Sequence, residues 1–158
     1  MSDSMNSVWR NPVHLLAFGF GSGLAPKAPG TAGTAVAVLI YLLLPAMPWP
    51  LYLAFLITVF SLGVWVCGKT AEDLGVHDHG GIVWDEFVGY WITMFMAPVG
   101  WVWVILGFVL FRLFDILKPW PVKWVDEQVK GGLGIMLDDV LAGAMAVLYM
   151  LVVQFLFL

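Results

Sequence analysis

The spacing of the charged residues constrains this chain more than any other feature. Asp, Glu, Lys and Arg are absent from three runs, residues 28–68, 87–111 and 140–158, which have 41, 25 and 19 residues. A membrane-spanning helix needs about 20 mostly apolar residues. Hydrophobic residues make up 61% of the chain and charged residues 11%, against about 45–50% and 25% in soluble proteins. We therefore expect an all-α, polytopic membrane protein with a single domain, residues 1–158.

Prolines divide the first uncharged run into two parts. Three of them fall in the segment 45–50, and proline lacks the N–H group that a helix interior needs. We expect one helix over residues 31–47 and a second over 50–68. The last uncharged run predicts a further helix over 138–157.

The middle run, residues 87–111, allows two topologies. It forms either one kinked helix or a hairpin that turns at 97–100, with arms over 82–97 and 100–118. Only the hairpin places every charged segment on one side of the bilayer. All seven Lys and Arg residues then share that side, which the positive-inside rule identifies as cytoplasmic. We predict about five membrane-embedded helices, with the N-terminus inside, the C-terminus outside and an interfacial segment over residues 13–24.

Two pairs of adjacent acids, Asp85-Glu86 and Asp138-Asp139, stand at predicted helix starts. The helix dipole explains one acid at such a position, at about 0.3–1 kcal/mol, but two acids in apolar surroundings are costly to desolvate. A divalent cation relieves the repulsion between clustered carboxylates. Oxygen ligands without His or Cys favour Mg²⁺ over Zn²⁺. We predict that all four acids are catalytic and hold Mg²⁺, with the number of ions left open.

A charged motif follows at residues 111–119. Arg112 and Asp115 are three residues apart, so they lie on neighbouring faces of one helical turn. They form either a local ion pair near a helix end or, at membrane depth, a functional site. Arg112 can clamp a phosphate group with two hydrogen bonds, and Lys118 can add a point charge. We predict that Arg112 and Lys118 bind phosphate and that Asp115 is catalytic, as a further ligand or a base.

The small residues of segment 24–34 predict a second phosphate-binding element. A helix start can present backbone N–H groups to an anion, so we predict that Lys27 and Thr31 also bind the phosphate. The Gly and Ala residues of this segment equally suit close helix packing.

Several other chemistries have little support in the sequence. A net charge of −4 with only seven Lys and Arg residues argues against a nucleic-acid partner. Cys67 is the single cysteine, so no cysteine pair is available for a disulfide or a zinc site. His77 and His79 form a His-x-His pair, for which we expect a solvated polar turn rather than a metal site.

The ordered motifs resemble those of the bacterial phosphatidylglycerophosphatase A family, which are membrane lipid phosphatases, over nearly the whole chain. The matching blocks are residues 19–23 (GFGSG), 29–31 (PGT), 77–78 (HD), 82–86 (IVWDE), 111–119 (FRLFDILKP) and 131–139 (GGLGIMLDD).

The resemblance implies a Mg²⁺-dependent phosphomonoesterase of phospholipid biosynthesis. Such an enzyme would hydrolyse phosphatidylglycerophosphate to phosphatidylglycerol and phosphate. It would be a multi-pass protein of the bacterial inner membrane, with the active site facing the cytoplasm. Its expected partners are the phospholipid substrate and membrane lipids, while the oligomeric state stays open.

Water attack and an aspartyl-phosphate intermediate are alternative routes for this hydrolysis. Two other functions also stay open. In a small membrane ion-binding or transport protein the carboxylates would line a permeation path, but the predicted spans carry almost no polar groups at mid-depth. A lipid headgroup phosphotransferase would use the same groups for exchange.

Overall fold

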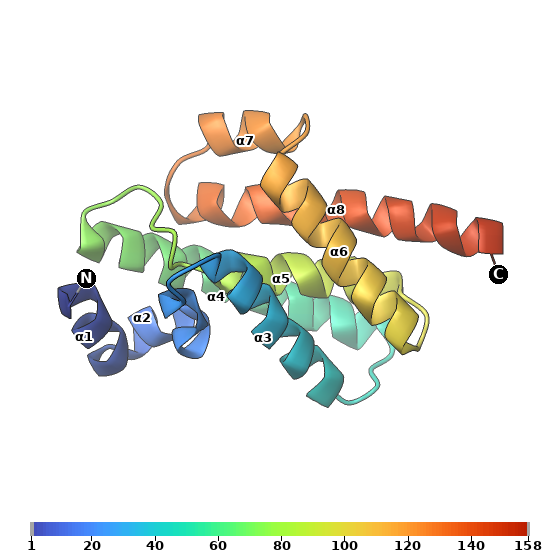
Figure 1. Ribbon diagram of the computed structural model, residues 1–158, viewed down its shortest axis with the longest axis horizontal. Coiled ribbons are helices and arrows are strands. Elements are labelled where there is room, and N and C mark those ends of the chain that lie inside the picture. Colours follow the sequence, from blue (N-terminus) through green and yellow to red (C-terminus); the bar gives the residue numbers. More distant parts are fainter. Residues whose placement is uncertain (1, 158) are drawn as a thin grey trace.

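A computed structural model describes residues 2–157, which form helices and connecting turns without any strand. Figure 1 shows the helices around the central helix α5, with α6 crossing in front of α8. The elements are α1 (Ser2–Arg10), α2 (Pro12–Ala17), the 3-10 helix η1 (Gly19–Leu24), α3 (Pro29–Leu43), α4 (Trp49–Leu74), α5 (Trp84–Thr93), the 3-10 helix η2 (Met94–Met96), α6 (Trp101–Leu117), α7 (Val122–Gln128) and α8 (Gly131–Phe157). The all-α expectation is confirmed for the described residues.

Two helices, α4 and α8, are long and apolar enough to cross a membrane. They have 26 and 27 residues, whereas α3, α5 and α6 have 15, 10 and 17. At 1.5 Å per residue the shorter three reach about 22, 15 and 25 Å, less than the roughly 30 Å of a bilayer core. The structure therefore supports two of the five predicted membrane-embedded helices as full spans.

The middle uncharged run forms a hairpin and not one kinked helix. Gly100 adopts a φ of 140° directly before α6 begins, a conformation that glycine reaches most easily. The Tyr90 hydroxyl of α5 donates a hydrogen bond to the carbonyl of Val104 on α6, at 3.2 Å. The predicted turn at 97–100 is thus confirmed, and α6 returns to the end of the molecule at which α5 begins (Figure 1).

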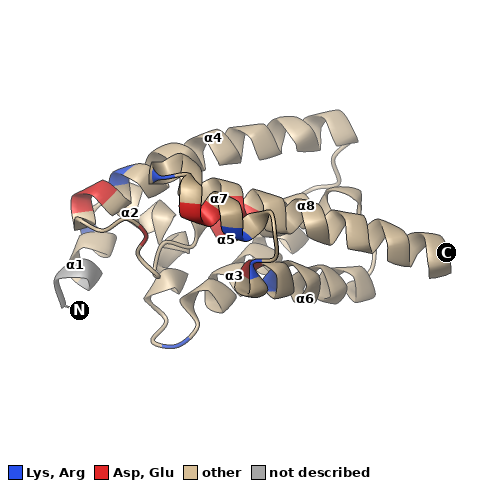
Figure 2. Cartoon of the chain, turned by 90° about the horizontal axis from the view of Figure 1, so that it is seen from above, with Lys and Arg blue, Asp and Glu red and all other residues tan. Residues whose placement is uncertain are grey.

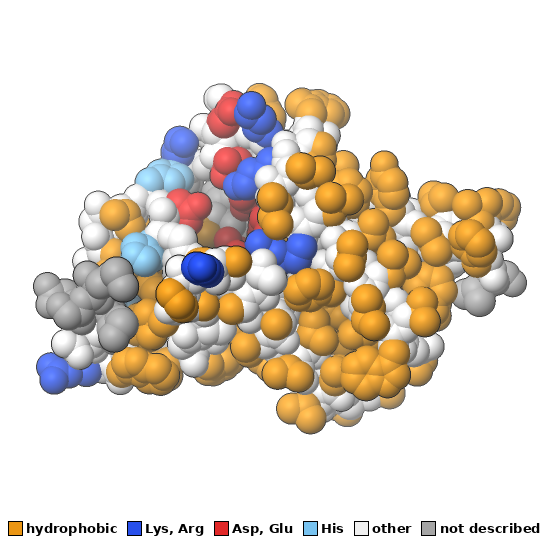
Figure 3. Space-filling view, viewed as in Figure 1, with side chains coloured by type: hydrophobic (Ala, Val, Ile, Leu, Met, Phe, Trp, Pro, Cys, Tyr) orange, Lys and Arg blue, Asp and Glu red, His pale blue; other side chains and the backbone are white. Residues whose placement is uncertain are grey.

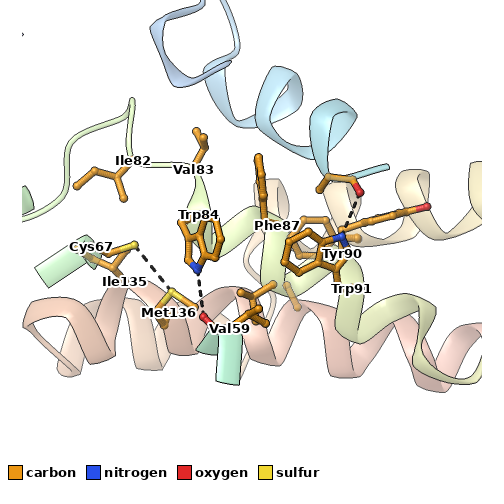
Figure 4. Packing of buried hydrophobic residues seen from close by; sticks show 14 of the residues in the cluster. Val59, Cys67, Ile82, Val83, Trp84, Phe87, Tyr90, Trp91, Ile135 and Met136 are labelled. Atoms are coloured by element: carbon orange, nitrogen blue, oxygen red, sulfur yellow. Dashed lines mark hydrogen bonds between the residues drawn. The ribbon is translucent and has the colours of Figure 1, made fainter. Parts of the chain in front are cut away.

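Tryptophan side chains of α5 fasten it to its neighbours (Figure 4). The indole N–H of Trp84 donates to the carbonyl of Val59 on α4, and that of Trp91 donates to the carbonyl of Ala37 on α3, both at 3.0 Å. Phe87 and Trp84 stack with ring centroids 5.6 Å apart. These contacts fix α5, and with it the acids of its first turn, inside the bundle.

Helix α8 approaches α5 and α4 closely because glycines lie at the crossings. A Cβ atom at Gly143 would lie 2.5 Å from the carbonyl oxygen of Gly89 on α5. A Cβ atom at Gly132 would overlap the carbonyl oxygen of Val64 on α4. Such approaches bring the backbone of α8 alongside α5, close to the turn that carries Asp85 and Glu86.

The start of α8 differs from the prediction. The helix begins at Gly131 and not near Asp138, so the Asp138-Asp139 pair lies two turns inside it. The three glycines at 131–134 disfavour a helix by propensity, but Gly132 and Gly134 pack against neighbouring backbone, and this packing stabilises the helix there. The second acidic pair is therefore not a pair of helix caps.

Charged residues gather at one end of the bundle. Figure 2 shows Lys, Arg, Asp and Glu around α7 and the beginning of α5, while the far halves of α4, α6 and α8 carry none. The hairpin produces this segregation, because it returns Arg112 and Asp115 to the end that holds Asp85 and Glu86.

Candidate active site

The first acidic pair lies in the first turn of α5, as the sequence predicts. The backbone N–H of Val83 donates to the carbonyl of Ala17 at 2.8 Å, so the start of the helix is tied to α2. No side chain caps this end of α5. Asp85 and Glu86 are partly buried, and they project from a fixed turn.

Asp139 of α8 joins this pair and forms the carboxylate cluster (Asp85, Glu86 and Asp139). One oxygen from each of the three residues lies within 4.8 Å of the others. Asp85 Oδ1, Glu86 Oε2 and Asp139 Oδ2 are buried and have no hydrogen-bond partner. Buried polar atoms without a partner are rare and call for an explanation such as an ion. Three hard oxygen ligands around one point suit Mg²⁺.

Arg112 lies beside the cluster. Its Nη1 atom is 3.7 Å from Glu86 Oε1 and forms an ion pair with Asp115 on the next turn. The Nε atom of Arg112 is buried without a partner. The side-chain contacts of Arg112 with described residues all go through Nη1, so the guanidinium retains donors next to the carboxylates.

The first turn of α3 packs against Arg112 and Glu86. A Cβ atom at Gly30 would lie 3.1 Å from both Nη atoms of Arg112 and would overlap Glu86 Oε1. Glycine at this position lets the first turn of α3 approach the two side chains. The first N–H groups of a helix lack partners within it, so Gly30 and the partly buried Thr31 bring a positive helix end to the site.

Lys118 and Asp138 pair with each other, and with Asp126 they form the lysine triad (Lys118, Asp126 and Asp138). The Lys118 ammonium lies 2.8 Å from Asp138 Oδ2 and 2.9 Å from Asp126 Oδ1. Burial acts to lower the pKa of Lys118, but its hydrogen bonds to Asp138 and Asp126 outweigh burial and raise the pKa above its ordinary value. The ammonium therefore stays charged.

The structure does not bring every predicted residue to one point. Lys27 is exposed on the loop before α3, and no ion pair or hydrogen bond of its side chain occurs among the side chains described, those of residues 6–157. His77 is exposed in the turn between α4 and α5, as expected of a polar turn, and His79 Nδ1 accepts a hydrogen bond from the Gly81 N–H at 3.0 Å.

Sequence reasoning missed Asp126 and named Gly30 only as part of the segment 24–34. Gly30 has a signal in the sequence, because a Pro-Gly-Thr start permits close approach, but nothing in the sequence indicates which side chains it meets. Asp126 has no such signal. It meets Lys118 only because the turn between α6 and α7 brings the two side chains together, and the sequence does not indicate the direction of that turn. Figure 3 shows the result as a hollow rimmed by acidic and basic side chains, with hydrophobic side chains covering most of the remaining face.

The fold and site together define an all-helical protein with a polar site suited to a divalent cation and an anionic group. The family model described as Phosphatidylglycerophosphatase A matches residues 15–154. The chain belongs to the phosphatidylglycerophosphatase A family.

Named relatives agree with this assignment. The chain is 52% identical to phosphatidylglycerophosphatase A of Escherichia coli K12, over 86% of this chain and 80% of the relative. It is 50% identical to the Haemophilus influenzae protein of the same name, over 92% and 90%. A provisionally named phosphatidylinositol-3-phosphatase of Bacteroides thetaiotaomicron is 45% identical over 82% and 85%. No solved structure matches the chain.

Proposed function

We propose that the protein hydrolyses phosphatidylglycerophosphate to phosphatidylglycerol and phosphate in a Mg²⁺-dependent reaction at the cytoplasmic face of the inner membrane. The observation that carries this proposal is the set of three unpartnered carboxylate oxygens in the carboxylate cluster, beside the free Nε donor of Arg112. Membership of the family supplies the substrate class.

Asp85, Glu86 and Asp139 would hold the cation. When bound, Mg²⁺ neutralises phosphate charge and activates water for attack on phosphorus. Arg112 has its Nη1 atom engaged by Asp115 and near Glu86, so its orientation is fixed before substrate arrives. Its guanidinium would donate to a phosphate oxygen, and the N–H groups at the start of α3 would support the same anion.

The arrangement of the helices supports a multi-pass topology. The α3–α4 and α5–α6 turns border one cavity of about 620 Å³, whose lining includes Pro45, Trp49, Pro98 and Trp101. Four helices therefore reach one uncharged end of the molecule. If α4 crosses the bilayer from Trp49, then α3 and the α5–α6 hairpin are embedded beside it, and the charged end faces the cytoplasm.

Phosphate release from the purified, detergent-solubilised protein tests the proposal. With phosphatidylglycerophosphate and Mg²⁺ we expect phosphate release that EDTA abolishes and added Mg²⁺ restores. Glu72→Gln is a matched control, because Glu72 is an exposed acid outside the cluster and this variant should keep full activity. Activity that persists in EDTA would refute the cation requirement. Nucleotide-dependent headgroup exchange without phosphate release would identify a phosphotransferase instead.

A further inference from the structure

The two acids of the second pair, Asp138 and Asp139, have different partners although they are adjacent in the sequence. Asp139 is 2% exposed, and its Oδ2 atom has no hydrogen-bond partner. Asp138 is also buried, at 6% exposed, but both of its oxygens are used. Oδ2 accepts from the Lys118 ammonium at 2.8 Å, and Oδ1 accepts from the backbone N–H of Asp139 at 3.0 Å. Of these two acids, only Asp139 has an oxygen without a hydrogen-bond partner.

Lys118 is held by an unusual backbone conformation. It terminates α6 in the left-handed region, with φ 44° and ψ 57°, and its N–H donates to the carbonyl of Phe114 at 2.9 Å. Residues other than glycine rarely adopt this region, and such strain persists where the surrounding structure over-determines it. The turn directs the side chain to Asp138 on α8 and Asp126 on α7.

The ammonium of Lys118 retains one donor. An ammonium group has three N–H donors, and Asp126 and Asp138 occupy two of them. The side chain is 30% exposed, so the third donor is accessible. Lys118 also follows Asp115 by three residues, which places it one turn beyond the Arg112–Asp115 pair on the same side of α6.

We propose that Asp138 is a positioning residue and not a metal ligand: together with Asp126 it holds the Lys118 ammonium at the rim of the carboxylate cluster, where the remaining N–H binds an oxygen of the substrate phosphate. This inference rests on the proposed phosphatase function. It gives the two acids of the second pair different tasks. Asp139 would bind the metal ion, whereas Asp138 orients the ammonium group of Lys118.

Cation binding and kinetics in the full-length protein test the assignment. We expect Asp139→Asn to weaken Mn²⁺ or Mg²⁺ binding, measured by calorimetry, about tenfold or more, because it removes one of three charged ligands. Asp138→Asn should leave the cation dissociation constant within about twofold. It should instead raise KM for phosphatidylglycerophosphate, as Lys118→Gln does, by about ten- to a hundredfold for the loss of a charged hydrogen bond.

The double variant Lys118→Gln/Asp138→Asn should be no worse than Lys118→Gln alone, since both changes remove the same contact. Lys118→Arg retains the charge and should recover part of the loss. A drop in cation affinity in Asp138→Asn equal to that in Asp139→Asn would overturn the proposal. The proposal would also be overturned if the rise in KM of the double variant equalled the product of the rises in the two single variants.

Asp126→Asn keeps the test valid if Asp138→Asn fails to fold. Asp126 is 38% exposed on α7, so its replacement threatens folding less. For Asp126→Asn the proposal requires a rise in KM that is smaller than that of Asp138→Asn, with unchanged cation affinity. An unchanged KM in Asp126→Asn would contradict the proposal. If the wild-type protein binds the cation but releases no phosphate, the phosphatase proposal fails, while the comparison of cation affinities still decides whether Asp138 is a ligand.

Discussion

The two acidic pairs resemble each other in sequence and differ in structure. Both acids of the first pair, Asp85 and Glu86, have a buried oxygen without a partner, whereas in the second pair only Asp139 has one. The first pair lies in the first turn of a short helix, and the second lies two turns inside a long one. Asp138 and Asp139 are about 100° apart around α8; Asp139 meets the first pair and Asp138 meets Lys118. The role of each acid in such a pair therefore depends on the side chains that surround it in the fold, and not on its neighbour in the sequence.

Replacing a cluster acid should have the largest effect and tests the comparison most directly. We expect Asp85→Asn to lower phosphate release about 10³-fold, because it removes a charge that would hold the cation. Asp139→Asn should behave alike, and helical content measured by circular dichroism should stay unchanged. Equal losses in Asp138→Asn would make the second pair functionally symmetric and break the comparison.

Arg112 contacts Glu86 of the first acidic pair and neither acid of the second pair. Its replacement should therefore sharpen the contrast between the two pairs. We expect Arg112→Gln to lower kcat/KM about a hundredfold through the loss of charge-assisted hydrogen bonds to phosphate. Arg112→Lys should recover little, because lysine lacks the planar fork of donors. Steady-state kinetics with saturating Mg²⁺ measure the effect. A variant with wild-type kcat/KM would remove Arg112 from the site.

The contact between Gly143 and Gly89 sets where α8 crosses α5, and perturbing it should have the smallest of these effects on turnover. We expect Gly143→Ala to lower the free energy of unfolding by about 1–3 kcal/mol, because its Cβ atom would meet the Gly89 carbonyl. Activity should fall modestly as Asp139 shifts. Thermal unfolding measures the loss, and Gly80→Ala is the control, because a Cβ atom there meets nothing within 4 Å. Equal stability of both variants would mean that the crossing tolerates a methyl group.

Much of the fold could be predicted from the positions of charges. The uncharged runs predicted the helices, and the need to place all charged segments on one side predicted the hairpin at 97–100. Helix lengths were less predictable, since α4 continues past Lys69 to Leu74 and α8 begins at Gly131. Charged residues and glycines usually end a membrane helix, but here close packing and contacts at the polar end extend both helices.

The candidate site was predicted in its residue types and not in its pairings. Patterns of acids and cations can indicate that a cation and a phosphate are bound, because those ligands require such groups wherever the chain folds. They cannot indicate that Lys118 pairs with Asp138, because that contact joins residues 20 positions apart across two helices. They also gave no reason to separate Lys27, which is exposed, from the cations that lie at the site.

The sequence by itself determined that the chain is helical, apolar over three long runs and charged at one end, because these properties follow from composition and order along the chain. Tertiary structure decided which carboxylates meet. Gly89 and Gly143 allow α5 and α8 to approach within backbone contact, and Gly30 lets α3 pack on the Glu86 and Arg112 side chains. This proximity brings Asp85, Glu86 and Asp139 together, while Asp138 pairs with Lys118. The distance between side chains on different helices depends on packing, which no local pattern encodes.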